Sequence, residues 1–576
     1  MNLLPRPRTV ELGASLVAND VVSETIDAAL PPEGYELRIT HRGIEVLGAD
    51  APGLFYARCT VEQLARLHDG RVPEGIVRDH PDLAVRGVML DVSRDKVPTM
   101  ATLRDLIGRL ASWKINQVQL YSEHTFAYEN HPDVHAQASP LTAAEIRDLD
   151  AFCRARHVEL VPNQNCLGHM NRWLQHDRYR SLALRPDGFV DQWGIFRKAM
   201  TLDPANPGSL ELIRELLAEL LPLFTSRRVH VGLDEAWELP RERMPEFLDW
   251  ISTLRALPEL DGREMLIWGD MLAHDDALLR SLPAGVTLCE WGYDEWHPYD
   301  ERGRALAAAG VPFWVAPGTS SWLTILGRVS NAVDTCRNAA RAALDHGATG
   351  YLNTDWGDQG HLQQPAISDP GFAYGAAVSW CLEANTDIDL AAALSVHAYD
   401  DPTGELASAL LSLGDAHLLV TPQFPNMSTI VLHLYFPQLT VGRGLTRGIT
   451  SDELAHLTRR LADARAAIDR AAPGRADAPL LIEELRWSVD IVDLLTRDAQ
   501  ARLDGDGTIG SMSEDTRHVF AAELEPLIAR YRERWLARNR PGGLDDSVSW
   551  LENLHAAYTT GQPDPAWGGW RVSPRD

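Results

Sequence analysis

Residues 228–237 read RVHVGLDEAW, and here a short apolar strand runs directly into two adjacent carboxylates, Asp234 and Glu235. The apolar, β-branched residues before the pair are typical of a strand, and Gly232 allows a backbone or a ligand to come close. Where a strand gives way to a loop, two neighbouring side chains can turn toward one pocket. An isolated Asp-Glu pair more often belongs to a solvated loop or a helix's first turn, so the surrounding sequence has to decide its meaning.

Around this stretch, short apolar strands alternate with longer amphipathic segments, which is the pattern of a parallel sheet with crossover helices. The predicted strands are residues 85–91, 117–121, 159–163, 229–233, 265–268, 287–291, 312–315 and 350–354. The predicted helices include residues 103–113, 143–156, 209–224, 302–309 and 332–346, and Thr142 with Glu145 forms a capping-box pattern before the second. This repetition predicts an α/β fold, a (β/α)8 TIM barrel.

The segments before and after the barrel have different patterns. Residues 1–80 contain two alternating strands around residues 41–43 and an Ala/Leu-rich helix near residues 61–67, so we expect a small α+β domain there. The barrel then spans residues 81–390. Beyond it, leucines recur at helical spacing, which predicts a mainly α-helical C-terminal domain over residues 391–576.

The composition limits the class of partner. The chain has 576 residues, of which 45% are apolar, and a net charge of −27, so it forms a large core under an acidic surface that repels phosphate backbones and anionic lipid. We therefore expect no nucleic-acid and no membrane partner. The N-terminus lacks the apolar run of a secretory signal, and the six cysteines lack the spacing of a zinc site or a disulfide scaffold. We expect a cytoplasmic protein without a metal or other cofactor, in which the helical tail could form a homodimer contact.

Polar and aromatic residues collect where the predicted barrel strands end, which is where barrel enzymes hold their active sites. Tryptophan packs on the apolar face of a sugar ring, and carboxylates and amides bind its hydroxyls, so this mixture favours a carbohydrate pocket. The residues concerned are Asp91, Glu123, His124, Asn163, Asn165, His169, Trp268, Asp270, Glu290, Trp291, Trp356 and Asp358.

The adjacent carboxylates suit one kind of glycosidase. Cleavage of a glycosidic bond needs a proton for the leaving oxygen, which Glu235 can supply, and stabilisation of the charge at the anomeric carbon. In substrate-assisted enzymes the sugar's 2-acetamido oxygen is the nucleophile, so the protein needs a carboxylate that orients the acetamide. Asp234, directly before the acid, fits that role.

Three motifs resemble glycoside hydrolase family 20, the β-N-acetylhexosaminidases. HVGLDEAW (residues 230–237) resembles the family's HxGGDE signature, with Leu233 in place of the second Gly. RGVMLDVSR (residues 86–94) is similar to the family's first barrel strand, and PNQNCLGHM (residues 162–170) to its PExDxPGH segment. The resemblance implies an exo-acting, retaining, metal-free β-N-acetylhexosaminidase for terminal β-linked GlcNAc or GalNAc.

The resemblance also implies roles for single residues. Asp234 would orient the acetamide, Glu235 would act as general acid and then base, and Arg86 would bind the sugar's C3 and C4 hydroxyls. The other substrate-binding residues that we expect are His169, Asn163, Glu123, His124, Trp268, Trp291, Trp356 and Asp358.

The sequence also departs from the family. Glu123 and His124 stand where an Asp-Asp pair is common, the Asp of the third-strand motif is absent, and GTSSWLTILGR (residues 318–328) replaces the segment that carries an acetamide-binding Tyr. Two alternatives stay open: a retaining glycosidase with Glu290 or Asp270 as a direct nucleophile, and a non-catalytic glycan-binding barrel. Turnover of sugars without an acetamide would favour the first, and binding without turnover the second.

Overall fold

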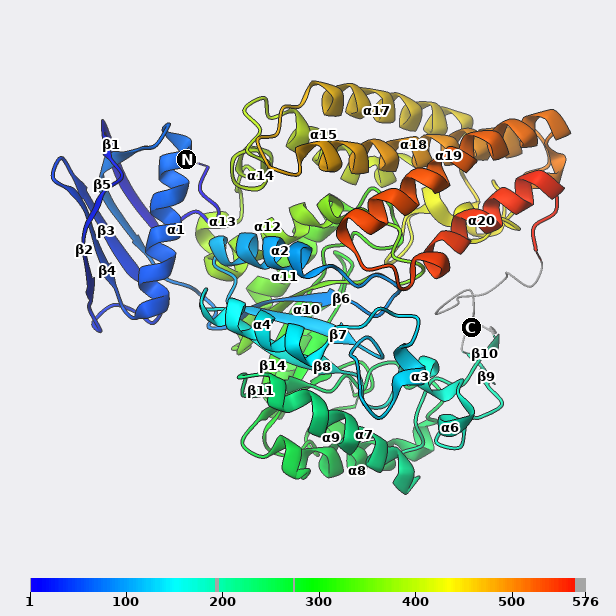
Figure 1. Cartoon of the computed structure of the whole chain (residues 1–576), viewed down its shortest axis with the longest axis horizontal. Coiled ribbons are helices and arrows are strands. Elements are labelled where there is room, and N and C mark those ends of the chain that lie inside the picture. The colour runs from blue at the N-terminus through cyan, green and yellow to red at the C-terminus, as the bar shows by residue number, and fades with distance from the viewer. Residues whose placement is uncertain (1, 192–195, 273–274, 565–576) are drawn as a thin grey trace.

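Eight parallel strands close into a barrel in the computed structural model, which describes residues 2–191, 196–272 and 275–564 (Figure 1). The order around the barrel is β11-β12-β13-β14-β15-β6-β7-β8. The first and last barrel strands in the sequence, β6 and β15, therefore pair with each other. The fold class predicted from the sequence is confirmed. The strands are β6 (Arg86–Asp91), β7 (Gln117–Ser122), β8 (Glu159–Gln164), β11 (Arg228–His230), β12 (Glu264–Trp268), β13 (Val286–Trp291), β14 (Phe313–Ala316) and β15 (Gly350–Asp355).

Helices surround the barrel, and every helix predicted between the strands overlaps one of them. The Thr142 side chain accepts from the Glu145 backbone N–H while the Glu145 carboxylate accepts from the Thr142 backbone, so the predicted capping box is confirmed. The helices are α2 (Met100–Ser112), α4 (Ala143–Arg154), α7 (Pro207–Leu220), α8 (Met244–Arg255), α10 (Tyr299–Ala309), α11 (Val329–His346) and α12 (Asp369–Trp380).

The N-terminal domain is a five-stranded sheet with α1 (Ala51–Leu67) on the face turned toward the barrel (Figure 1). The sequence predicted only the hairpin of β3 (Tyr35–Thr40) and β4 (Gly43–Gly48) and the end of α1. β2 (Val21–Ile26) is exposed along its whole length and lies at an edge of the sheet, so its sequence lacks the apolar alternation that marks a half-buried strand. The sheet is completed by β1 (Thr9–Ala18) and β5 (Arg71–Asp79).

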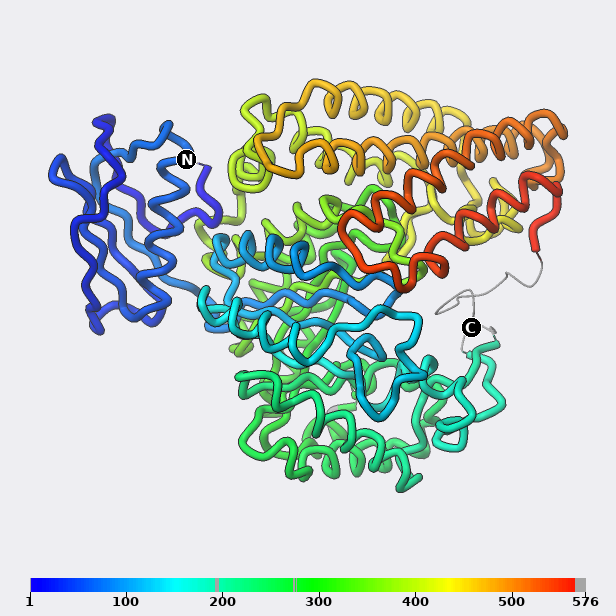
Figure 2. The backbone as a smooth tube through the Cα atoms, in the orientation of Figure 1, coloured from blue at the N-terminus to red at the C-terminus, as the bar shows by residue number. Residues whose placement is uncertain are grey.

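The C-terminal domain is helical, as predicted, and lies along one side of the barrel (Figures 1 and 2). Most of its buried apolar side chains form one contiguous cluster with those of the barrel, whereas the N-terminal domain has a core of its own. None of the helices that the structure describes is long and apolar enough to cross a membrane. The longer helices are α15 (Glu405–Gly414), α17 (Ser451–Arg470), α18 (Ala478–Leu503), α19 (Glu514–Arg538) and α20 (Leu544–Thr560).

Candidate active site

The backbone that carries the two carboxylates is strained. Strand β11 already ends at His230, and Leu233 and Glu235 both have positive φ angles, of 73° and 51°. Placing a residue with a side chain in this left-handed region costs of the order of 1–2 kcal/mol, which explains why the HxGGDE signature has its second glycine at the position of Leu233. The alternating conformation turns the Asp234 and Glu235 side chains toward the same histidine, His169.

Asp234 is buried and held in its charged form. Its Oδ1 accepts a hydrogen bond of 2.7 Å from Asn165 Nδ2, and its Oδ2 lies 3.2 Å from His169 Nε2. Burial alone would raise the pKa of this carboxyl, but the charge and hydrogen bond of His169 lower it below its ordinary value. A carboxylate fixed in this way can accept a hydrogen bond but is poorly placed to donate a proton.

His169 joins the two carboxylates. Its Nε2 lies 3.3 Å from Glu235 Oε2, and its Nδ1 lies 3.3 Å from Arg94 Nη2. Although burial opposes the charge, Asp234 raises the pKa of His169 well above its ordinary value. The loop reaches this place because Gly168 packs on the Asp234 carbonyl, where a Cβ would come within 2.2 Å of the oxygen.

Asp270 supports the pair from the end of β12. Its Oδ2 accepts the Glu235 backbone N–H at 2.9 Å, and its Oδ1 accepts the indole N–H of Trp291 at 3.3 Å. Burial, together with the neighbouring charge of Asp234, raises the pKa of Asp270 to about 7. Both of its oxygens are therefore engaged in holding other groups, and the side chain is partly protonated at neutral pH.

A guanidinium group lies on the other side of His169. Arg94 pairs with Asp91 at 3.2 Å and with Glu123 at 3.4 Å, and Glu123 also accepts the Tyr121 hydroxyl at 3.0 Å. Burial raises the pKa of Asp358 to about 7 against the opposing charge of Arg94. These groups offer both donors and acceptors to sugar hydroxyls.

Aromatic rings form the wall of the site. The rings of Trp268 and Trp356 lie 5.9 Å apart, and Trp291 stacks on Tyr293 at 5.1 Å with an angle of 17° between the planes. The Tyr293 hydroxyl accepts the Trp356 indole N–H at 2.8 Å. The three tryptophans listed from the sequence therefore come together, with Tyr293 as a fourth ring that the sequence interpretation missed.

Arg86 does not belong to this site, which corrects the role implied by the resemblance. It is the first residue of β6 and is fully buried at the N-terminal end of the barrel, where it pairs with Glu33 at 2.6 Å and donates to the Lys114 carbonyl at 2.9 Å. Barrel active sites lie at the other end of the strands, so the arginine three residues beyond the strand, Arg94, is the one that reaches the site. The sequence already indicated this, because Arg94 follows Asp91 at the C-terminal end of the first barrel strand.

Three more residues from the sequence interpretation lie away from the carboxylate pair. Asn163 points into the barrel interior, where its Nδ2 donates to Gln119 Oε1 at 2.9 Å. His124 lines a separate cavity of about 270 Å³ beside Arg172. Glu290, an alternative nucleophile, pairs with Arg302 at 3.1 Å and His297 at 3.3 Å. Strand register and loop direction, which the sequence does not specify, decide these placements.

No group of three or more metal-ligating side chains with the arrangement of a metal site occurs among the described residues. The site as built offers an ionised carboxylate, a second carboxylate that is partly open to solvent, a histidine between them and a ring of aromatic side chains. This arrangement can bind a sugar ring and transfer a proton at one edge of it.

The comparisons with known proteins agree with this arrangement. The family model for the glycosyl hydrolase family 20 catalytic domain matches residues 84–343, and the model for domain 2 of the same family matches residues 2–80. The chain belongs to glycosyl hydrolase family 20. Together the two matches cover the N-terminal domain and most of the barrel, while the helical C-terminal domain lies outside them.

Relatives within the family are distant. A lacto-N-biosidase of Bifidobacterium bifidum is 28% identical over 218 residues, which are 37% of this chain and 19% of that protein. A β-hexosaminidase of Akkermansia muciniphila is 25% identical over 265 residues, which are 41% of this chain and 53% of that protein. The chain thus spans about half or less of the length of these curated relatives.

Solved structures share the fold. A family 20 β-N-acetylhexosaminidase of Streptomyces coelicolor superposes with a TM-score of 0.54 and 20% identity, covering 69% of this chain and 95% of that chain. At this identity the likeness describes the fold, and the activity has to be argued from the site itself.

Proposed function

We propose that the protein is an exo-acting β-N-acetylhexosaminidase that removes terminal β-linked GlcNAc or GalNAc with retention of configuration. The observation that carries the proposal is the pairing of a buried, ionised Asp234 with the more exposed Glu235 through His169. Two adjacent carboxylates in different environments can take two different roles. Membership of family 20 supports the same activity.

In the proposed reaction the sugar supplies its own nucleophile. Glu235 donates a proton to the glycosidic oxygen as the bond to the anomeric carbon breaks, and the acetamide carbonyl oxygen forms a bond to that carbon. Asp234 accepts the acetamide N–H and stabilises the positive charge of the oxazolinium ring. Glu235 then takes a proton from a water molecule whose oxygen opens the ring at the same carbon, so the configuration is retained.

A direct carboxylate nucleophile is less well supported. Of the two candidates, Glu290 is engaged by Arg302 and His297, and both oxygens of Asp270 accept hydrogen bonds from Glu235 and Trp291. A pKa of about 7 leaves Asp270 partly protonated, which makes it a weak nucleophile at neutral pH.

The test is release of p-nitrophenol from the β-GlcNAc, β-GalNAc and β-glucoside derivatives by wild type, Asp234→Asn and Glu235→Gln. We expect turnover of the acetamido sugars only, and a loss of about 10²–10³-fold in kcat for each variant. Cleavage of the glucoside that is insensitive to Asp234→Asn would refute substrate assistance. Binding of oligosaccharides without turnover would instead identify a glycan-binding barrel.

We further propose a reducing, cytoplasmic setting, which is supported by six cysteines that are all buried and unpaired. Fractionation of cells that express the full-length protein tests this. A homodimer contact through the helical domain stays a prediction, and sedimentation velocity of the purified protein tests it.

A further inference from the structure

The C-terminal domain touches the barrel at the loops that follow two strands of the active site. The segment from the last residue of α19 to the residue before α20, residues 538–543, runs beside the loop that follows β6, residues 93–99. Pro98 and Asn539 form an antiparallel bridge, the Thr99 N–H donates to the Arg538 carbonyl at 2.9 Å, and the Arg540 N–H donates to the Val97 carbonyl at 2.8 Å. We call residues 538–543 the clamp segment.

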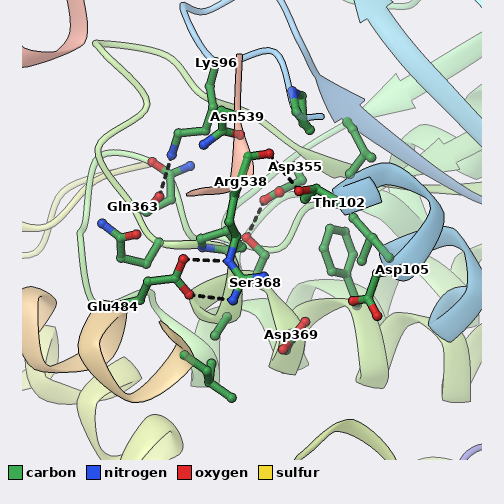
Figure 3. A pocket seen from close by; sticks show the side chains of 18 of the residues that line it. Lys96, Thr102, Asp105, Asp355, Gln363, Ser368, Asp369, Glu484, Arg538 and Asn539 are labelled. Carbon is green, nitrogen blue, oxygen red and sulfur yellow. Dashed lines mark hydrogen bonds and ion pairs between the residues drawn. The ribbon is translucent and has the colours of Figure 1, made fainter. Parts of the chain in front are cut away.

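Side chains reinforce this backbone pairing, as Figure 3 shows. The Thr102 hydroxyl donates to the Arg538 carbonyl at 2.7 Å, and the Arg538 guanidinium pairs with the buried Glu484 of α18 at 2.6 Å. Lys96 Nζ donates to the Gln363 carbonyl at 2.9 Å, which ties the β6 loop to the loop that follows β15. The clamp segment is therefore itself held by α18 of the C-terminal domain.

The tightest contact of the clamp segment is with Asp95, the residue that follows Arg94 in the chain. Gly543 packs on the backbone of Asp95, where a Cβ would come within 2.0 Å of the carbonyl oxygen. Asp95 has a φ of 67°, and its carboxylate pairs at 3.3 Å with Arg172, which also pairs with Asp546 of α20 at 3.0 Å. A non-glycine residue stays in this left-handed conformation only where its surroundings hold it there.

The residue immediately before Asp95 is Arg94, whose guanidinium lies against Glu123 and His169. We propose that the C-terminal domain, through Gly543 and Asp546, positions Arg94 in the active site. These two are positioning residues, because both act on Asp95, which follows Arg94 in the chain: Gly543 packs on its backbone, and Asp546 pairs with Arg172, which pairs with its carboxylate. The role of Arg94 as a sugar ligand rests on the proposed function, but its placement beside His169 does not.

A pair of glycine variants tests whether the packing of Gly543 on Asp95 positions Arg94. Gly543→Ala adds a Cβ against Asp95, and Gly347→Ala is its matched control, because Gly347 has a φ of 74° at the end of α11 and no atom lies within 4 Å of its Cβ position. Both glycines have a positive φ, so either change strains the backbone and should lower the thermal midpoint; Gly543→Ala should lower it further, because its Cβ also meets Asp95. Only Gly543→Ala should raise KM, by about tenfold, which corresponds to one weakened hydrogen bond to a charged group.

A second pair of variants tests the ion pairs that link Asp546 to Asp95 through Arg172. It decides the proposal even if Gly543→Ala fails to fold. Asp546→Asn weakens the hold on Arg172, whereas Asp545→Asn removes a pair with Arg532 inside the C-terminal domain. We expect a rise in KM of a few fold for Asp546→Asn with kcat nearly unchanged, and no change in KM for Asp545→Asn. Equal effects in the two variants would overturn the proposal.

Two readouts separate positioning from general loss of structure. In an Arg94→Lys background, Gly543→Ala should no longer change KM, because the group that it displaces has been removed. Independently of any turnover, the ring 15N signals of His169, assigned with His169→Gln, should shift in Gly543→Ala and not in Gly347→Ala. An undiminished KM effect in the Arg94→Lys background, or unmoved His169 signals in folded Gly543→Ala protein, would overturn the inference. If wild type turns over no acetamido sugar, the proposed function fails while the His169 signals still decide the positioning.

Discussion

The histidine between the two carboxylates makes a quantitative prediction. His169→Gln keeps a hydrogen-bond donor of similar length but removes the positive charge that lies 3.2 Å from Asp234 and 3.3 Å from Glu235. Because His169 lowers the pKa of Asp234 in the wild type, the variant should have an Asp234 that protonates at higher pH.

The size of the effect follows from the contact. At an effective dielectric constant of 20, two unit charges 3.2 Å apart attract by about 5 kcal/mol, most of which is offset by the water that both groups lose. A hydrogen bond to a charged group contributes a net of about 1.5–3 kcal/mol, which corresponds to a pKa change of about one to two units.

The assay is the pH dependence of kcat/KM on p-nitrophenyl β-GlcNAc, whose acidic limb reports the essential base of the free enzyme. We expect this limb to move up by about one to two units in His169→Gln, so that activity is lost most severely in acid. His131→Gln is the control, because His131 also pairs with a carboxylate, Glu215 at 3.2 Å, outside the site. An acidic limb that stays where it is in wild type would refute the reasoning.

Three further predictions concern the sugar-binding side and the wall of the site. Arg94→Lys should raise KM by about tenfold, since a bidentate donor is lost, whereas Arg86→Lys should leave KM unchanged and lower the thermal midpoint, because that residue is buried below the barrel. Steady-state kinetics and thermal melts of both variants distinguish the two roles. A KM that rises in Arg86→Lys and stays unchanged in Arg94→Lys would show that Arg86 binds the substrate. The raised pKa of Asp358 means that the native state holds a proton that the unfolded state has released between pH 3.8 and about 7. The free energy of unfolding should therefore fall as pH rises through this window, by at most about 1.4 kcal/mol per unit, and Asp358→Asn should flatten the slope seen in urea titrations. Tyr293→Phe removes the acceptor of the Trp356 indole N–H and should cost about 1–3 kcal/mol of stability as well as activity on acetamido sugars; a variant with wild-type melting and kinetics would contradict this role for the hydroxyl.

Much of the fold could be predicted from local patterns. Barrel strands are buried on both faces, so each appears as a short apolar run, and all eight were found within a few residues of their positions. The edge strand β2 was missed because its residues are exposed and carry no such pattern. The strained turn at Leu233 could also not be read from the sequence, since its conformation depends on what packs around it.

The candidate site was predictable in part. Asp234, Glu235 and His169 lie in contiguous motifs, and the structure brings both carboxylates within hydrogen-bond distance of the histidine. Arg86 was misplaced because a motif identifies a strand but does not by itself show which end of the strand faces the substrate.

By itself the sequence determined the barrel, the helical tail and the adjacent carboxylates, because these depend on short-range periodicity and on neighbouring residues. Only the tertiary structure decided that Arg94 and Tyr293 join the site, that His124 turns to another cavity, and that Gly543 of the C-terminal domain packs on Asp95, the residue after Arg94. These contacts join residues far apart in the chain, and no local pattern records them, because they arise from how the loops at the end of a closed barrel fold against one another.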